Sequence, residues 1–183
     1  MLTFDSPGAF AAHLRRVLAN LPATDKAALE LAGAMIRDET KAVLGQYQTS
    51  HTGPFLPWAP LAQLTREERV AQGYPANEPL LRSGILRANI EMSADQQMAV
   101  IGVPDREVQH PYSDMPVNIG EVAVDLEFGT KHMEPRSFLG LTMFRFGEAA
   151  AALIGSVEAA NLAGLAPLRW TVLPGVRLPT AAE

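Results

Sequence analysis

The spacing of apolar residues changes twice along this chain, and these changes limit the folds that it can adopt. Up to about residue 44, apolar side chains recur every three or four positions, which is typical of amphipathic helices. Parts of 86–128 alternate between apolar and polar residues, as half-buried strands do, and Ser137 to about Ala163 is again helical in pattern. This order predicts an α+β fold, in which an antiparallel sheet of about three to four strands packs against N-terminal helices and one long C-terminal helix.

The N-terminal part predicts two helices that are separated near Pro22, because proline breaks the interior of a helix. Ser6 is placed to cap the first helix, and Pro7 suits its first helical position. Thr24 is placed to cap the second helix, and Gly45 marks its end.

The next part of the chain predicts loops around one short helix. Thr49–Pro60 contains three prolines, a glycine and two large aromatic residues, which favours a long loop. Thr65–Glu68 resembles a capping box, and Gly73 would stop the helix that begins there. Pro75–Pro79 is a further connector.

Three strands are predicted in the second half of the chain. Leu86–Ile90 alternates in polarity, Asp95–Gln97 forms a turn and Met98–Val103 returns, which is the pattern of a hairpin. Pro104–Pro116 is polar and irregular. Val122–Phe128 alternates again, which predicts a third strand or a strand that continues a short helix.

The length of 183 residues favours a single domain, which at this size buries roughly 70% of its unfolded surface. Apolar residues make up 48% and charged residues 19%, so the chain is expected to be globular. The predicted divisions are a helical part (1–47), a loop-rich part (48–84), a sheet with the long helix (85–165) and an irregular tail (166–183) that holds a last edge strand over Leu168–Val172.

The composition also argues against several classes of function. A net charge of −5 disfavours broad contact with nucleic-acid phosphates, and the lack of cysteine excludes disulfides and thiolate chemistry. Met1–Asp5 lacks the regions of a signal peptide, and apolar runs such as Ala149–Ile154 are too short to cross a membrane. We therefore expect a soluble protein of the reducing cytoplasm without membrane contact.

The most distinctive local feature is the segment from Leu126 to Leu139. Leu126–Thr130 is a strand-like run that ends in a glycine turn, and Met133–Leu139 then places a proline and an arginine before the long helix. Nothing in the segment resembles a nucleophile motif, a phosphate-binding loop or a metal-binding motif. It therefore predicts a structural corner, which favours assembly over catalysis.

Candidate catalytic and metal-binding residues are few. His51, His110 and His132 lie in predicted loops without helical i, i+4 spacing, so a zinc site that combines His132 with Glu127 has little support. No glycine-rich phosphate loop or nucleophile elbow is present. Asp125 and Glu127 share a strand face and could act as paired carboxylates, although a solvated outward face is the simpler interpretation. No catalytic residue, cofactor or metal is expected.

Three surface features leave alternatives open. Glu127 could pair with an arginine of a neighbouring subunit, for which Arg136 is one candidate. Phe55 and Trp58 either close over the core or anchor a partner. A solvated surface, or a basic patch that contacts DNA or an acidic partner, would each account for Arg66, Arg69, Arg82 and Arg87.

Four ordered motifs resemble those of phage virion-morphogenesis and tail-completion proteins. Trp58–Leu61 has the W-x-P-L pattern, and Pro79–Leu86 has the pattern P-L, an apolar residue, x-[ST]-G-x-L. Val100–Gly102 lies where the family has its V-x-[IV]-G strand. Leu126–Thr130 contains the EFGT turn, and Met133–Leu139 has the proline–arginine–phenylalanine segment that follows it. The resemblance covers more than half of the chain.

The resemblance implies a non-enzymatic minor structural protein of a tailed phage, prophage or phage-like particle. Such proteins act at the head-proximal end of the tail, where they complete the tail or join it to the head. The implied partners are further copies in a ring, for which a hexamer would match the tail symmetry, and neck or tail proteins such as the tail terminator, tail tube or head-completion protein. DNA would only pass through a channel. The protein would be made in the bacterial cytoplasm and incorporated into the virion.

The loops Thr49–Pro60 and Pro104–Pro116 are expected to contact neighbours, and Phe128 and Phe138 to pack the corner around Gly129. Two other functions stay open, namely a small hydrolase that uses Glu127 with His132 and a DNA-contacting neck factor that uses the arginines. The expected assembly interface consists of Phe55, Trp58, Leu61, Glu127, Phe128, Gly129, Arg136 and Phe138.

Overall fold

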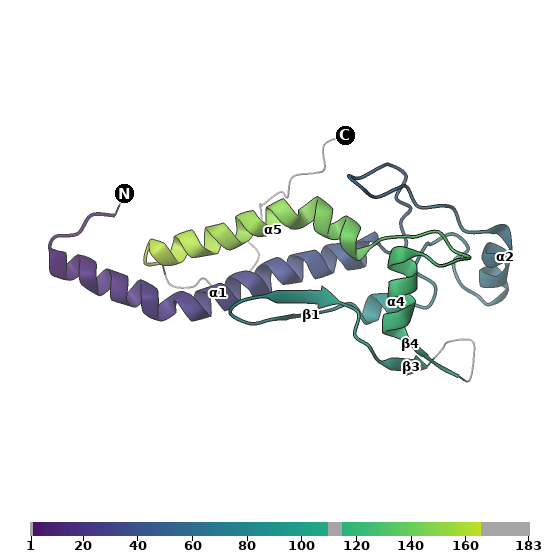
Figure 1. Cartoon of the computed structure of the whole chain (residues 1–183), viewed down its shortest axis with the longest axis horizontal. Helices are drawn as coiled ribbons and strands as arrows, with labels where there is room; N and C mark the ends of the chain where they lie inside the picture. The colour runs from purple at the N-terminus through teal and green to yellow at the C-terminus, as the bar shows by residue number, and fades with distance from the viewer. Residues whose placement is uncertain (1, 110–114, 166–183) are drawn as a thin grey trace. The chain divides into compact units, whose positions relative to one another are not determined.

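The structure of the protein is a computed structural model that describes residues 2–109 and 115–165 (Figure 1). It confirms the α+β class, because long helices and short strands occupy successive parts of the chain. The described elements are α1 (Pro7–Val43), α2 (Gln63–Ala71), α3 (Ile85–Ala88), β1 (Glu91–Ala94), β2 (Ala99–Gly102), β3 (Glu107–Gln109), β4 (Pro116–Asn118), α4 (Ile119–Phe128) and α5 (Leu139–Leu162).

The two helices predicted at the N-terminus are one continuous helix, α1, so the predicted break near Pro22 is wrong. Ser6 caps it as predicted, since its Oγ accepts the N–H of Ala9 at 3.1 Å. Thr24 does not cap a helix; its buried hydroxyl donates to the carbonyl of Asn20 at 3.0 Å. Buried side chains on both sides of Pro22 hold the two halves in one helix despite the donor that proline removes.

The short helix predicted after the loop is present as α2, but the predicted capping box is wrong. The helix begins at Gln63, so Thr65 lies inside its first turn, and no side chain caps its N-terminus. Leu61, just before the helix, is buried. Gly73 follows the helix with a φ of 78°, as its predicted role as a stop requires.

The predicted hairpin is present as β1 and β2, but its first strand begins later than predicted. Leu86 lies in the helix α3 instead of a strand. Leu86 and Ile90 are both buried, and their spacing of four suits a helical turn as well as a strand. Asp95 forms the turn, where its carboxylate accepts the N–H groups of Gln97 at 2.7 Å and Met98 at 2.9 Å. These two hydrogen bonds lower the pKa of Asp95.

The described strands form two separate two-stranded sheets instead of one sheet of three to four strands. One sheet is the β1–β2 hairpin. In the other, β3 pairs antiparallel with β4, and Val108 lies opposite Val117. The prediction that Pro104–Pro116 is irregular throughout is therefore wrong, because a short antiparallel pair forms at its two ends.

Val122–Phe128, predicted as a strand, belongs to the helix α4. Asn118 caps this helix, since its Oδ1 accepts the N–H of Gly120 at 2.9 Å. The alternating pattern was ambiguous because Val122 and Leu126 are also four residues apart, which places both on one helical face. With its start capped and one face packed on the core, the segment is more stable as a helix.

The long C-terminal helix is confirmed. Its bounds in α5 lie within one or two residues of the predicted Ser137 to Ala163. The helix is apolar on more than one face, as predicted: Leu141 is buried, whereas Met143 and Phe144 are more than half exposed. The last edge strand predicted over Leu168–Val172 lies outside the described residues.

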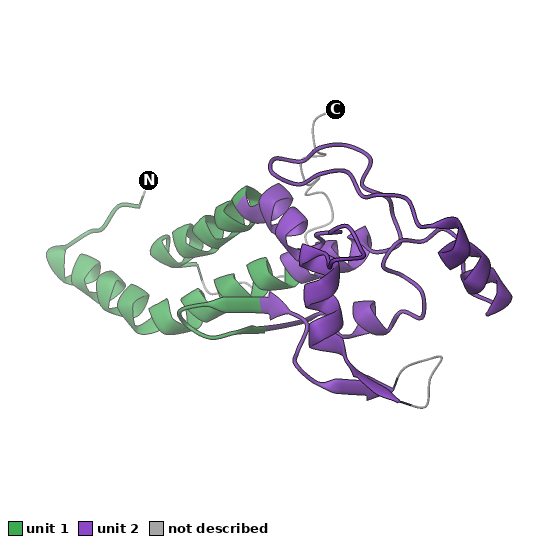
Figure 2. Ribbon diagram, turned by 45° about the vertical axis from the view of Figure 1, so that its right-hand side comes forward, with its two compact units in different colours: residues 1–35, 93–100, 148–183 green, residues 36–92, 101–147 purple. Residues whose placement is uncertain are grey.

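The chain divides into two compact units, which have different colours in Figure 2. Within the described ranges, unit 1 draws on Met1–Met35, Ser93–Val100 and Glu148–Glu183, and unit 2 comprises Ile36–Met92 and Ile101–Gly147. The elements α1, β1, β2 and α5 each begin in one unit and end in the other. The units therefore share continuous elements and do not correspond to separate stretches of sequence.

Unit 1 contains polar contacts between α1 and α5. His13 is buried, and its Nε2 donates to the carbonyl of Leu162 at 3.0 Å. Asp25 of α1 hydrogen bonds to Glu158 of α5, and the pKa of Glu158 is raised first by burial and then by this contact. The buried apolar side chains of the unit come from both helices and include Val17, Ala28, Ala32, Ala150 and Val157.

A hydrophobic core lies in unit 2, and every residue discussed as a site below belongs to this unit. Phe138, directly before α5, is completely buried. Trp58, in the loop before α2, is also buried, and its backbone N–H donates to the carbonyl of Gln48 at 2.8 Å. The buried core residues are Val43, Leu44, Trp58, Leu86, Ile90, Ile119, Ala123, Phe138 and Leu141.

Candidate functional site

The turn between α4 and α5 has the backbone that the sequence predicts for a corner. Gly129 ends α4 with a φ of 79°, and its N–H donates to the carbonyl of Asp125 at 2.9 Å. A Cβ atom at this position would lie 2.8 Å from the carbonyl oxygen of Met133 and 2.9 Å from the nitrogen of Pro135. The positive φ and this close approach both require glycine here.

Glu127 caps the N-terminus of α5 with both carboxylate oxygens. Its Oε2 accepts the N–H groups of Phe138 at 2.8 Å and Leu139 at 3.0 Å. Its Oε1 accepts the N–H of Gly140 at 2.9 Å and the hydroxyl of Ser137. The first N–H groups of a helix have no partner within the helix, and a negative charge there interacts favourably with the helix dipole. Glu127 therefore fixes the direction in which α5 leaves the corner.

Arg136 joins the corner to the segment that contains Trp58. Its guanidinium is buried and donates to the carbonyl of Ala59 from Nε at 3.3 Å and from Nη2 at 3.0 Å. Its backbone N–H donates to the carbonyl of Leu126 at 2.8 Å. The partner of Arg136 thus lies in the same chain, and Glu127 is engaged by α5, so the structure does not show the cross-subunit pair considered from the sequence.

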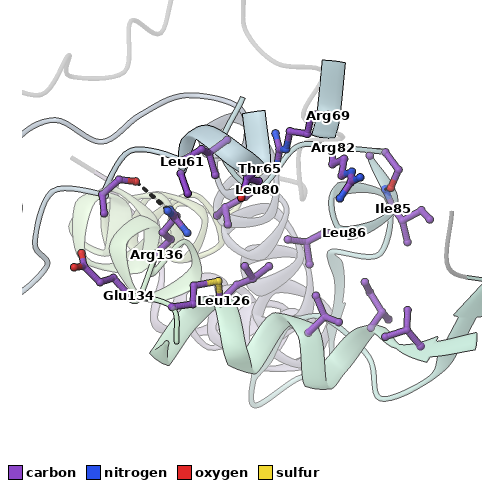
Figure 3. A pocket seen from close by; sticks show the side chains of 18 of the residues that line it. Leu61, Thr65, Arg69, Leu80, Arg82, Ile85, Leu86, Leu126, Glu134 and Arg136 are labelled. Carbon is purple, nitrogen blue, oxygen red and sulfur yellow. Dashed lines mark hydrogen bonds between the residues drawn. The ribbon is translucent and has the colours of Figure 1, made fainter. Parts of the chain in front are cut away.

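Beside the corner lies a groove of about 690 Å³, which Figure 3 shows from close by. The loop before α2, the α3 region, the β3–β4 sheet and one face of α4 line it. Its charged lining consists of Arg69, Arg82, Arg136 and Glu134, so the groove is more positive than negative. Its large apolar lining residues are Leu61, Leu80, Ile85, Leu86, Val108, Val117, Ile119, Val122, Leu126 and Met133.

The residues expected to form an assembly interface differ widely in exposure. Trp58, Leu61 and Phe138 are buried in unit 2, where they support the fold of the single chain. Phe55 is half-buried. Phe128 is 76% exposed, so the expectation that it packs the corner is wrong, whereas Phe138 does pack there. Helix α4 turns the side chain of Phe128 outward, which a strand at this place would not have done.

The loop Thr49–Pro60 is folded against the start of α5. Thr52 and Phe55 form an antiparallel bridge, and Phe55 packs edge-on against Phe144 with ring centroids 6.1 Å apart. Gly53 packs against the ring of Phe144, since a Cβ atom at residue 53 would lie 2.2 Å from this ring. Arg145 donates to the hydroxyl of Thr52 at 3.1 Å. These contacts leave Leu56, 65% exposed, as the large apolar side chain at the tip.

The two residues of the catalytic alternative have different surroundings in the structure. His132 lines the groove, whereas Glu127 does not and is engaged by α5. His51 is exposed, and His110 lies outside the described residues. Within the described ranges, no three histidine, aspartate or glutamate side chains come together to hold a metal ion.

The four arginines considered as a basic patch do not share one environment. Arg69 is buried and donates to the carbonyl of Glu78 at 2.6 Å. Arg82 forms an ion pair with Glu68 at 3.0 Å. The other two, Arg66 and Arg87, are exposed.

Two features of unit 2 were missed from the sequence: the groove and the outward face of α4. The outward face carries Glu121, Val124, Asp125 and Phe128, all of them exposed. Their spacing of i, i+3, i+4 and i+7 is a signal of one helical face. The same segment also alternates between apolar and polar residues, which favours a strand. The groove had no local signal, because its lining comes from distant parts of the chain.

Comparison of the chain with protein-family models, with curated proteins and with solved structures found no match. In the part of the chain that the structure describes, no helix combines the length and the apolarity needed to cross a membrane.

Proposed function

We propose that this chain is a non-enzymatic structural protein of a tailed phage, prophage or phage-like particle, which acts in tail completion or head–tail joining at the neck. It assembles with further copies of itself, as a ring through which DNA passes, and with neighbouring neck or tail proteins. It is made in the bacterial cytoplasm and becomes part of the virion. The resemblance of four ordered motifs is the origin of this proposal.

One observation supports it above the others: three motif segments that are far apart in sequence meet around one groove in unit 2, whereas the Val100–Gly102 segment does not line it. Leu61, Leu86 and Leu126 come from three different motifs and line the same groove. Arg136 of a further segment binds the carbonyl of Ala59, 77 positions away. The motif residues of this chain thus build one piece of architecture, which is what the proposal expects of residues that form a scaffold.

The polar residues of the motifs also act in this scaffold. Both oxygens of Glu127 cap α5, and the guanidinium of Arg136 binds backbone. A carboxylate that accepts four hydrogen bonds at a helix start is poorly placed to transfer a proton to a substrate. This arrangement favours a structural role over acid–base catalysis.

The test is deletion of the gene from the phage or prophage that encodes the chain, followed by electron microscopy of the particles. We expect tailless heads and unjoined tails, and restoration of complete particles when the wild-type protein is supplied separately. Complete infectious particles in the absence of the protein would contradict the proposal. Complementation with the variants Glu127→Gln and His132→Ala separates catalysis from structure. Loss of infectivity by variants that fold and still form complete particles would indicate an enzyme.

A further inference from the structure

The outward face of α4 carries both apolar anchors and negative charge. Val124 is 56% exposed and Phe128 is 76% exposed. Glu121 and Asp125 lie beside them on the same face, because positions i, i+3, i+4 and i+7 share one side of a helix. Among the described residues, neither carboxylate forms an ion pair. This face is an amphipathic, acidic strip about 10 Å long, given a rise of about 1.5 Å per residue.

The groove offers the complementary surface. Its floor is apolar, and three arginines but a single glutamate line it. The guanidinium of Arg136 binds the neutral carbonyl of Ala59, so its positive charge adds to the charge of the groove lining. The volume of about 690 Å³ lies within the range of about 300–1,000 Å³ in which pockets enclose a drug-sized molecule, so it has room for two apolar side chains.

We infer that the outward face of α4 in one copy docks into the groove of a second copy. Helices bind grooves in this way when apolar residues at i and i+4 enter an apolar floor. Val124 and Phe128 supply these anchors, and the negative charges of Glu121 and Asp125 complement the net positive charge of the groove lining. Of the lining arginines, Arg69 and Arg136 are buried and bind backbone carbonyls, and Arg82 pairs with Glu68. This pairing deepens the proposed assembly function and rests on it, because it takes a further copy of the chain as the partner.

The position of the two surfaces determines what such docking builds. Ile119, Val122 and Leu126 on the inner side of α4 line the groove, and Val124 and Phe128 project from its opposite side. Each copy therefore offers one face and one groove, which are different surfaces. A contact of this heterologous kind repeats from copy to copy, and it closes into a ring or continues as a filament.

The inference is tested by the mass of the purified full-length chain in analytical ultracentrifugation. Val124→Lys places a positive charge opposite the arginines, and Ala62→Trp fills the mouth of the groove at an exposed position that lines it. Val100→Lys is the matched control, since Val100 has the same 56% exposure in unit 1. We expect oligomers for the wild type and for Val100→Lys, and a weakening of about tenfold or more for the other two.

Mixing the two defective variants is the decisive step. An intact face of one variant and an intact groove of the other allow a single contact, so the mixture should form dimers and nothing larger. A second groove variant, Ser83→Trp, keeps the test valid if Ala62→Trp does not fold by circular dichroism. A monomeric wild type, or oligomers that survive both substitutions, would overturn the inference.

The two proposals fail in distinguishable ways. If the wild type forms oligomers and the variants do so equally, the docking surfaces are wrong while assembly stands. If the mixture forms the expected dimers but particles that lack the protein are complete, the docking is correct and the proposed phage function is wrong.

Discussion

Glu127 illustrates how the role of a single residue depends on what surrounds it. In the sequence it is one of two carboxylates that could share a strand face, and in the structure it accepts four hydrogen bonds at the start of α5. Arg136 changes in the same way, from a candidate for a contact between subunits to a donor that binds Ala59 in its own chain. Both side chains hold backbone groups that would otherwise be buried without partners.

Replacing Glu127 should lower the stability of the folded protein. We expect Glu127→Ala to lower the free energy of unfolding by about 1–3 kcal/mol, because the donors of the first turn of α5 lose their acceptor. Glu127→Gln keeps one acceptor oxygen and should cost less. Urea denaturation measures both, with Glu148→Ala, an exposed acid of α5, as a control expected to stay within about 0.5 kcal/mol. Equal unfolding midpoints for Glu127→Ala and the wild type would refute the capping role.

The cost of adding a side chain at Gly53 should depend on the ring of Phe144. Its φ is 54°, and a Cβ atom would lie 2.2 Å from Phe144. We expect Gly53→Ala to cost about 1–3 kcal/mol, from the strained backbone and from displacement of the ring. In a Phe144→Ala background the steric part disappears and roughly 1–2 kcal/mol should remain. A double-mutant cycle from chemical denaturation measures the difference, and an unchanged cost would mean that the ring is not what constrains the loop.

At the scale of elements, α1 shows tertiary packing that overrides a local rule. Pro22 removes a hydrogen-bond donor from the interior of the helix, yet the helix continues through it. Pro22→Ala should therefore raise the free energy of unfolding by about 1–3 kcal/mol, since proline is the least favourable residue inside a helix. Thermal and urea denaturation measure this gain. Lys26→Ala, at an exposed site of the same helix, controls for helix propensity and should have little effect. If Pro22→Ala is less stable than the wild type, the proline contributes to the packing of the helix.

The contact between α1 and α5 in unit 1 should depend on pH. The pKa of Glu158 is raised above its ordinary 4.5, chiefly by burial and then by Asp25. The folded state thus binds the proton of Glu158 more tightly than the unfolded state does. The stability that protonated Glu158 contributes is therefore complete below pH 4.5 and is lost as the pH rises through the raised pKa.

Glu158→Gln should therefore stabilise the protein at neutral pH and have less effect under acidic conditions, because it removes an ionised group from beside Asp25. The gain should be small, since Glu158 is only partly buried and solvent screens its interaction with Asp25. Melting temperatures at the two pH values measure it, with Glu148→Gln as the control on the same helix. A gain that is larger in acid than at neutral pH would contradict the assigned direction.

For the whole molecule, the apolar surface of the single chain is the property that bears on assembly. Large apolar side chains stay exposed on α4, and also along the first turns of α1 at Phe10, Leu14 and Leu18. Exposed apolar patches of this kind often mark surfaces that bind a partner. In the proposed oligomer the α4 residues become buried, so the folded state gains stability when copies associate.

The melting temperature of the wild type should consequently rise with protein concentration, as mass action requires when only folded copies associate. Val124→Lys should show a smaller rise over the same range, and Val100→Lys should behave as the wild type. Differential scanning fluorimetry over a roughly hundredfold range of concentration measures the effect. A melting temperature that is independent of concentration in all three proteins would speak against self-association through α4.

Several elements followed from the sequence alone. The α+β class, the cap at Ser6, the turn at Asp95 and the long helix α5 were predicted because their signals are local. A cap, a turn or a sustained apolar period depends on neighbouring residues, so a single stretch of chain contains the information. Gly129 belongs to this group, since a glycine between two elements indicates a backbone that other residues rarely adopt.

Tertiary structure decided the continuity of α1 through Pro22, the helical state of α4, the cap provided by Glu127 and the groove. The groove depends on contacts between distant positions, such as Ala59 and Arg136, which are 77 residues apart. The cap provided by Glu127 depends on how the end of α4 meets the start of α5. The period of Val122–Phe128 fits a strand and a helix equally, so packing of one face on the core made the choice. Local patterns thus determined individual caps, turns and the helix α5, and burial between distant segments determined how the groove is built.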